Sequence, residues 1–145
     1  MDKTYYITTP IYYPSAKPHI GHAYSSIIAD FFARFKIIDD YEVYFLTGTD
    51  EHGLKIQRSA EKAGKDPQIF CDQISQTFWD LSNTLNLSNT DFIRTTEARH
   101  KKTVQYLWSE LEKNDDIYLS NYSGWYSVSD EAFYNEDEIV EVDGK

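Results

Sequence analysis

The amino-acid sequence predicts an α/β fold with a parallel sheet, on three observations. Short segments rich in β-branched and aromatic residues alternate with longer segments whose apolar residues recur every three or four positions. Glycine and proline punctuate the junctions. The alternation stops after about residue 116, where no further helical segment follows. Strands that alternate with helices indicate βα units with right-handed crossovers, so we expect the first half of a doubly wound sheet.

The first βα unit is predicted from residues 3–38. Residues 3–9 (KTYYITT) have the composition of a strand, and a loop with three prolines follows them. An amphipathic helix then begins, because large apolar residues step by three and four: Ile20, Tyr24, Ile27, Ile28, Phe31, Phe35 and Ile38. Residues 19–22 (HIGH) therefore lie at the first turn of a helix that follows a strand.

The second unit begins with residues 42–47 (EVYFLT), a short apolar run typical of a buried parallel strand. Gly48 ends this run, and a polar loop leads into a helical segment that Gly64 closes.

A further helix begins at Asp66, which serves as its cap, with Pro67 at the first helical position. Its apolar residues keep the helical step as far as Leu85. Residues 91–96 are predicted as a strand and residues 97–114 as a helix, which completes the alternation.

The character of the chain changes near Ile117, where a tyrosine-rich, strand-like stretch begins. We therefore place a domain boundary there, with one domain at residues 1–116 and the start of a second, β-rich domain at residues 117–145.

Composition limits the class of protein. The 145 residues are about one domain in length, and 41% apolar residues suffice for a core. The mean hydropathy is −0.59, no apolar run reaches a membrane span, and the N-terminus lacks the apolar core of a signal peptide. We expect a cytoplasmic protein with no membrane contact. The lone Cys71 excludes an internal disulfide and is expected to be buried in a helix.

The net charge of −10 argues against a general nucleic-acid surface, but the charge is uneven. Residues 130–143 hold seven of the 24 acids and no base, which leaves 17 acids against 13 bases in residues 1–129. The main body is only mildly acidic, and we expect the acidic stretch to be a solvated surface.

His19 and His22 are the first candidate site. Three positions apart on a first helical turn, they share a face beside the free N–H groups that attract phosphate. Gly21 between them leaves room for a flat ring such as a nucleobase. A zinc pair and an ordinary surface pair of histidines are the alternatives.

Residues 47–53 (TGTDEHG) form the second candidate site, at the end of the next strand. Ligands collect at the carboxyl ends of strands in open α/β sheets, so Asp50, Glu51 and His52 are expected to face the same crevice as the two histidines. An ordinary turn would also use aspartate and glycine, but three ionisable residues in succession exceed what a turn needs.

Four segments together, TTPIYYPSAKPHIGHAYS, FLTGTDEHG, DFIRTTEARHKK and GWYSVSDEAFY, resemble the N-terminal catalytic region of methionyl-tRNA synthetases. These are class I aminoacyl-tRNA synthetases with a HIGH motif. The resemblance covers nearly the whole chain. It implies a Rossmann-like catalytic domain, of which residues 1–116 are the N-terminal half, and a connective insertion that starts at residue 117.

The resemblance also implies roles at the ATP site. His19 and His22 would be catalytic, binding the phosphates of ATP with its Mg²⁺ and stabilising the transition state of adenylate formation. Gly21 would let adenine lie against the backbone.

At the amino-acid site, Ile11 and Tyr13 would wall the methionine pocket, and Asp50 would meet the ammonium group of L-methionine. His52 would stand in the same pocket. From the residues alone, plain core packing is the alternative for Ile11 and Tyr13. The implied partners are L-methionine, ATP and tRNA(Met).

Two features depart from the family pattern. Ser127 and Asp130 stand where many members carry a zinc-binding Cys-x-x-Cys, so we expect no structural zinc and no other metal site. The sequence ends inside the insertion, without the mobile Lys-Met-Ser-Lys-Ser-type loop. We therefore expect a fragment that is inactive alone and that self-associates through an unpaired sheet edge.

Two other functions stay open from the sequence. One is a class I synthetase for a different amino acid. The other is a catalytically silent nucleotide- or RNA-binding module, for which the only local basic cluster is Arg94, Arg99, Lys101 and Lys102.

Overall fold

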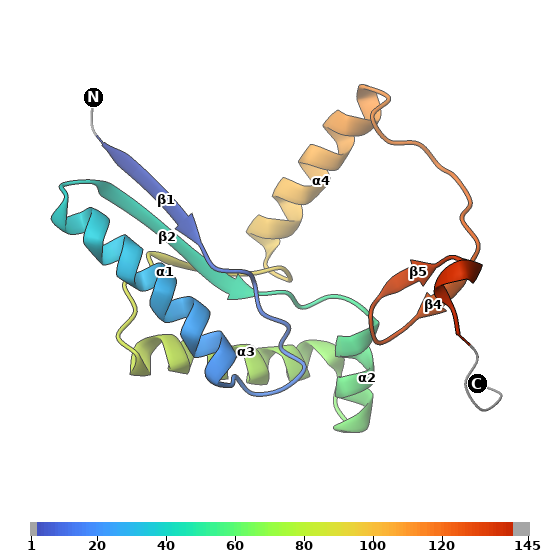
Figure 1. Ribbon diagram of the computed structural model, residues 1–145, viewed down its shortest axis with the longest axis horizontal. Helices are drawn as coiled ribbons and strands as arrows, with labels where there is room; N and C mark the ends of the chain where they lie inside the picture. Colours follow the sequence, from blue (N-terminus) through green and yellow to red (C-terminus); the bar gives the residue numbers. More distant parts are fainter. Residues whose placement is uncertain (1–2, 141–145) are drawn as a thin grey trace. The chain divides into compact units, whose positions relative to one another are not determined.

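The structure is a computed structural model that describes residues 3–140. Strands and helices alternate as predicted (Figure 1). The strands of the first sheet are parallel in the order β1-β2-β3. The elements are β1 (Thr4–Thr8), α1 (Ile20–Ile38), β2 (Glu42–Thr49), α2 (Leu54–Lys62), α3 (Pro67–Thr84), β3 (Asp91–Arg94), α4 (Ala98–Lys113), β4 (Trp125–Ser127) and β5 (Ala132–Tyr134).

Contacts divide the chain into two compact units, Met1–Val104 and Gln105–Lys145. The division falls inside α4, and the domain boundary that we place at Ile117 from the sequence stays a prediction. Within residues 3–140, no helix is long and apolar enough to cross a membrane.

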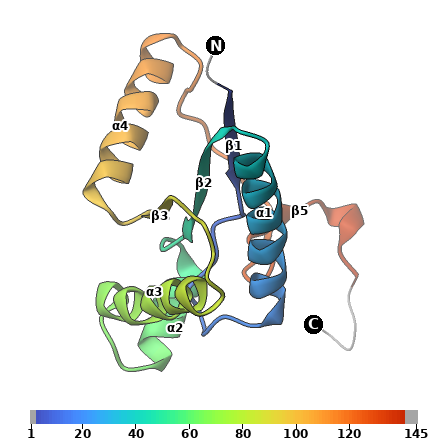
Figure 2. The ribbon, with the colours of Figure 1, turned by 90° about the vertical axis from the view of Figure 1, so that its left-hand side faces the viewer.

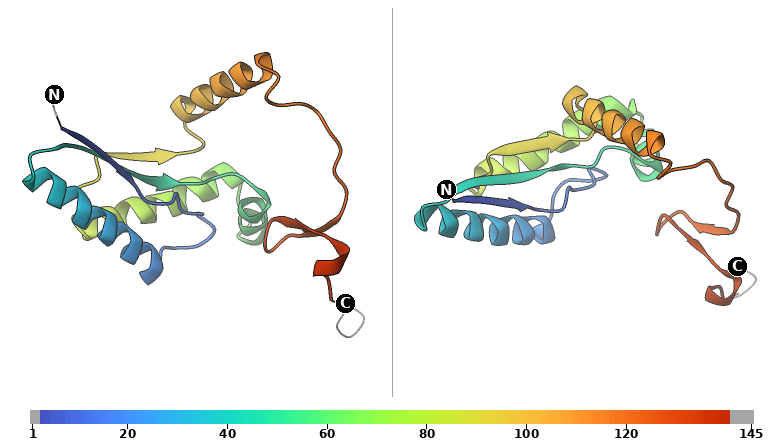
Figure 3. Two further views of the ribbon diagram at one scale, coloured as in Figure 1. Left: turned by 45° about the horizontal axis from the view of Figure 1, so that its top comes forward. Right: turned by 90° about the horizontal axis from the view of Figure 1, so that it is seen from above.

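One face of the three-stranded sheet is covered by α1 and α3, which lie on the same side of it in the left-hand view of Figure 3. The register pairs Ile7 with Phe45 and Thr47 with Phe92, so the apolar side chains of neighbouring strands project to this face. On the opposite face Tyr6 and Tyr44 stack on each other, with ring centroids 5.6 Å apart, and both remain exposed.

The helix α1 meets the sheet through small residues, contrary to what its apolar periodicity suggests. Ala23, Ser26, Ala29 and Ala33 are buried, and Ala29 and Ala33 pack on Phe45. Small side chains allow a helix backbone to approach strands closely, and α1 lies beside β1 and β2 in Figure 2. The large apolar residues that predict the helix lie on its exposed side, with Ile20 84% and Ile38 85% exposed.

The helix α3 builds the second part of the core and confirms its sequence signals. Asp66 caps it, accepting hydrogen bonds from the backbone N–H groups of Gln68 at 2.8 Å and Ile69 at 3.2 Å. Phe78 packs with Tyr12 and Phe92, and Cys71 is 1% exposed, as predicted.

Gly48 lets β2 and β3 approach each other. A Cβ atom at this position would lie 1.9 Å from the carbonyl oxygen of Ile93, its partner in the parallel ladder. Any side chain here would force the strands apart, so the glycine helps to set the spacing of the strand ends that carry the candidate site.

The second unit contains an antiparallel hairpin of β4 and β5, followed by a 3₁₀ turn at Glu136–Glu138. The strand-like stretch predicted from Ile117 is confirmed only from Trp125 onward, since residues 116–123 have no regular structure. Phe133 contacts the rings of Tyr122 and Tyr126 at centroid distances of 4.9 and 5.0 Å. All three rings remain exposed, so this aromatic cluster is not a closed core.

Candidate active site

His19 and His22 cap the N-terminus of α1 reciprocally. His19 Nδ1 accepts a hydrogen bond from the backbone N–H of Gly21 at 3.0 Å, and His22 Nδ1 accepts one from the backbone N–H of His19 at 3.0 Å. A nitrogen that accepts a hydrogen bond carries no proton, so each neutral ring holds its proton on Nε2. The cap therefore prepares both imidazoles as Nε2–H donors beside the positive end of a helix.

The two rings lie close together, with centroids 3.9 Å apart. Burial lowers the pKa of His22, and repulsion from a charged His19 lowers it further. His22 is therefore mainly neutral near pH 7, in the form that can both accept the capping bond and donate from Nε2.

The absence of a side chain at Gly21 also has a structural role, besides leaving room for a ligand. A Cβ atom here would lie 2.9 Å from Cε1 and 3.1 Å from Nδ1 of His19. Alanine would push against the ring that caps the helix, so the glycine keeps the His19 imidazole in place.

Tyr12 lies between the histidines and the end of β2. Its backbone N–H donates to Gly48 O at 3.0 Å, and its carbonyl accepts from the backbone N–H of Asp50 at 2.9 Å. Its ring meets His22 edge-on, with centroids 4.9 Å apart. Asp50 and His22 thus both contact Tyr12, Asp50 through the Tyr12 backbone and His22 through the Tyr12 ring.

Ile11 and Tyr13 are exposed to 40% and 41%, whereas Tyr12 between them is 8% exposed. The alternation is that of an extended segment, and Tyr12 forms an isolated parallel bridge with Thr49. Ile11 and Tyr13 are therefore not part of the buried core formed by the described residues.

His52 lies on the β3 side of the loop that follows β2. Its Nε2 is 3.3 Å from the carbonyl oxygen of Thr95. It lines a cavity of about 300 Å³ together with Asp66, the cap of α3, and residues of α3 and α4 that include Cys71 and Lys101.

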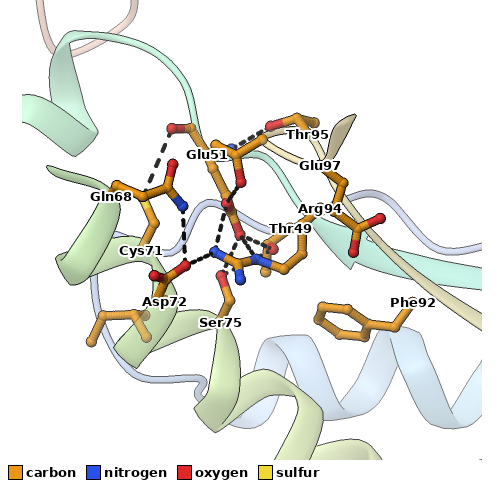
Figure 4. Close-up of polar contacts among 12 residues, drawn as sticks. Thr49, Glu51, Gln68, Cys71, Asp72, Ser75, Phe92, Arg94, Thr95 and Glu97 are labelled. Carbon is orange, nitrogen blue, oxygen red and sulfur yellow. Dashed lines mark hydrogen bonds and ion pairs between the residues drawn. The ribbon is translucent and has the colours of Figure 1, made fainter. Parts of the chain in front are cut away.

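Glu51 does not face the crevice as expected from the sequence. It is 4% exposed, and its carboxylate accepts from Arg94 Nε at 2.6 Å and Arg94 Nη2 at 3.0 Å (Figure 4). Hydroxyl groups of Thr49, Ser75 and Thr96 also donate to it. Sequence reasoning missed the buried position of Glu51, because most of its hydrogen-bond partners come from segments distant in the sequence. The signal was present, since a buried carboxylate needs a cation and Arg94 ends the next strand.

The network determines the electrostatics around Glu51. Desolvation would raise the pKa of Glu51, but the hydrogen bonds from Arg94, Ser75, Thr96 and Thr49 outweigh it and lower the pKa. Desolvation, with the negative charge of Glu51 nearby, raises the pKa of the Cys71 thiol to about 11. Glu51 is therefore ionised and Cys71 is not.

Arg94 and Arg99, from the basic cluster of the sequence, are both engaged in ion pairs. Arg94 Nη2 is 2.5 Å from Asp72 Oδ1 in addition to its contacts with Glu51. Arg99 makes two hydrogen bonds to Asp91, at 2.6 and 2.9 Å, and pairs with Glu97. These ion pairs reduce the positive charge that the two arginines could offer to the phosphate groups of an RNA.

Ser127 and Asp130 hydrogen bond to each other, with Oγ 2.5 Å from Oδ2, at the turn between β4 and β5. Among residues 3–140, no group of three or more histidine, cysteine, aspartate or glutamate side chains is arranged to hold a metal ion.

Comparison with known proteins identifies the family. The family model described as tRNA synthetases class I (M) matches residues 5–144. Methionine–tRNA ligase of Rickettsia bellii is 55% identical over 97% of this chain and 28% of its own length, and that of Listeria monocytogenes is 52% identical over 96% and 21%. Methionyl-tRNA synthetase of Mycobacterium tuberculosis, solved in complex with methionyl-adenylate, superposes with a TM-score of 0.93 at 51% identity, over 98% of this chain and 28% of that one.

The chain thus spans about a quarter of the length of the relatives that it matches. The structural match confirms the predicted α/β fold with the first strands of a Rossmann-like sheet. The family match confirms the resemblance drawn from the four sequence segments. This chain belongs to the tRNA synthetases of class I (M).

Proposed function

We propose that this chain is part of the catalytic domain of a methionine–tRNA ligase and that it holds ATP and L-methionine there. The methionine carboxylate attacks the α-phosphorus of ATP, pyrophosphate leaves, and methionyl-adenylate forms. The methionyl group then passes to the terminal ribose of tRNA(Met). No protein nucleophile takes part, so the rate depends on positioning and on donors that stabilise developing phosphate charge.

His19, Gly21 and His22 form the ATP side of the proposed site. ATP enters as its Mg²⁺ complex, and the two Nε2–H groups donate to its phosphate oxygens. The reciprocal cap is the observation that carries this proposal, because it fixes both proton positions before ATP arrives. Donors prepared in this way need no reorganisation in the transition state.

Ile11, Tyr13, Asp50 and His52 form the methionine side. The exposed side chains of Ile11 and Tyr13 suit a polarizable thioether, and Asp50 at the end of β2 suits an ammonium group. The proposed protein works in the cytoplasm with tRNA(Met) and without structural zinc. The ion pairs of Arg94 and Arg99 favour this proposal over an RNA-binding module.

Calorimetric titration of the chain with methionine, ATP and tRNA(Met), each separately, tests the proposal. We expect methionine to bind, and Asp50→Asn to weaken it at least about tenfold because a charge-assisted hydrogen bond is lost. Asp137→Asn, an exposed acid in the 3₁₀ turn, is the matched control and should bind normally. Binding of tRNA(Met) without methionine binding would overturn the proposal in favour of the module.

A further inference from the structure

Tyr12 contacts both halves of the proposed site, although it does not face the site itself. Its backbone is bonded on one side to Gly48 and on the other to Asp50, at 3.0 and 2.9 Å. Its side chain points in the opposite sense to those of Ile11 and Tyr13 and is buried against α1 and α3. The residue is therefore joined rigidly to the end of β2.

The hydroxyl of Tyr12 is held at the N-terminal part of α1. It lies 2.9 Å from Ser25 Oγ and 3.0 Å from the buried Ser26 Oγ. It also donates to the carbonyl oxygen of His22 at 3.4 Å. These contacts attach the first turns of α1 to the segment that carries Asp50.

The ring of Tyr12 confines the His22 imidazole. Tyr12 stacks on Phe78, with centroids 5.5 Å apart and an interplanar angle of 18°. Both rings meet His22 edge-on, at centroid distances of 4.9 and 5.1 Å. With His19 at 3.9 Å, the His22 ring is surrounded by three others and has little freedom to turn.

We propose that Tyr12 is a positioning residue for adenylate formation, which holds the imidazole of His22 at a fixed distance from Asp50. The inference rests on the proposed function, in which Asp50 anchors the amino acid and His22 anchors the phosphates. Attack of the carboxylate on phosphorus requires that both substrates keep one spacing, and misplacement by about 1 Å can cost about 100-fold in rate. A shift of Tyr12 alters this spacing without removing a substrate contact, so it should lower kcat more than it raises KM.

Three variants separate this role from simple core packing. Tyr12→Leu removes the ring contacts, and Tyr12→Phe keeps the ring but loses the bonds to Ser25 and Ser26. Phe92→Leu is the matched control, because Phe92 belongs to the same core cluster as Tyr12 but makes none of the ring contacts of His22.

The first measurement is ATP–pyrophosphate exchange in a full-length enzyme that carries these substitutions. We expect Tyr12→Leu to lower kcat at least about tenfold, with KM for methionine and ATP changed by less than about threefold. Tyr12→Phe should lie between Tyr12→Leu and the unsubstituted enzyme, and Phe92→Leu should lower the unfolding midpoint while kcat stays within about threefold. An unchanged kcat in Tyr12→Leu, or an equal loss in Phe92→Leu, overturns the proposal.

The second measurement is independent of catalysis. Nitrogen-15 NMR of the imidazoles in this chain reports the proton position and the pKa of His22, and His100 in α4 serves as the reference signal. Loss of the Tyr12 ring exposes His22, whose titratable neighbours are His19 and Tyr12, so Tyr12→Leu should raise the pKa of His22 toward its ordinary value. If His22 is unaffected, the positioning role is wrong. If the chain binds no methionine while His22 responds, the proposed function fails and the Tyr12–His22 contact stands.

Discussion

Glu51 and Arg94 form a bidentate ion pair. Glu51 follows strand β2, and Arg94 is the last residue of the neighbouring strand β3. Arg94 Nε is 2.6 Å from Oε1 of Glu51, and Arg94 Nη2 is 3.0 Å from Oε2. The Glu51 side chain is fully buried, whereas that of Arg94 keeps 25% of its surface exposed. The pair joins the loop after β2 to the end of β3, next to Asp50.

Removal of one partner of this pair should strongly destabilise the fold. Arg94→Met leaves a buried carboxylate without its cation, and we expect a loss of about 3–5 kcal/mol in the free energy of unfolding, measured in urea. Asp72→Asn is the matched control, because the Asp72 side chain is 51% exposed and its pair with Arg94 should contribute less than about 1 kcal/mol. Similar losses in the free energy of unfolding in both variants would contradict the conclusion that Glu51 is the main partner of Arg94.

Acid should weaken the fold through Asp91 as well as Glu51. Hydrogen bonds from Arg99 lower the pKa of Asp91 from 3.8 to about 2. Its folded-state pKa is depressed, so the unfolded chain binds more protons and stability falls as the pH drops from about 4 toward 2. Urea midpoints measured between pH 6 and pH 2.5 should show this decline, and Asp91→Asn should make it shallower. An identical pH profile in Asp91→Asn would refute the assignment.

The thiol of Cys71 should resist alkylation while the chain is folded. Its pKa is raised to about 11 from 9.0, and its side chain is buried. The thiolate population at pH 8 is then lower by about 100-fold, and burial slows access further. Iodoacetamide labelling, followed by mass spectrometry with and without urea, measures the ratio of rates. A native rate within tenfold of the rate in urea would show that the thiol is accessible.

Gly21→Ala should impair the site without unfolding the helix. The new methyl group would contact the His19 ring at 2.9 Å and displace it from its capping position. Loss of one prepared donor costs about 100-fold or more in comparable oxyanion sites, so we expect a large fall in ATP–pyrophosphate exchange by the full-length enzyme, as for His22→Ala. A loss of less than about threefold in either variant would exclude the proposed role of the imidazole pair. Gly124→Ala is the matched control, because Gly124 has no left-handed backbone and a Cβ atom there would meet other atoms only at 3.6 Å or more.

The chain should self-associate in solution. Within residues 3–140, β1 and β3 are the edge strands of the sheet, and the outer side of α1 exposes Ile20, Phe31 and Ile38. Light scattering at increasing concentration should show oligomers, and Phe31→Lys should shift the population toward monomer. Gln57→Lys on α2 adds the same charge elsewhere and should leave the association unchanged. A monomer at all concentrations would contradict this prediction.

The bounds of the helices could be predicted because their signals are local. The apolar step begins at Ile20 and ends at Ile38, as the helix does, and Asp66 with Pro67 marks the start of α3. The face of α1 that is buried could not be predicted in this way. Periodicity shows that large residues share one side, but the sheet accepts the side with small residues because the backbones can then approach more closely.

Some residues of the candidate site could be proposed from the sequence because their signals are local, whereas others could not. His19 and His22 were identified through their place at a helix start, and Asp50 through its place after a strand. The orientation of Glu51 depends on Arg94, 43 positions away, and on the close approach of β2 and β3 at Gly48. Tyr12 between Ile11 and Tyr13 resembles any aromatic core residue until its contact with His22 is seen.

The reciprocal histidine cap makes the start of α1 less stable than a more common cap residue would. Serine, threonine, asparagine and aspartate begin helices better than histidine, and their side chains satisfy the same backbone N–H groups. Aspartate at position 19 would therefore be expected to stabilise the helix start and, under the proposed function, to remove one phosphate donor. Under the proposed function, the motif gives up part of the stability of the helix start in return for two Nε2–H donors.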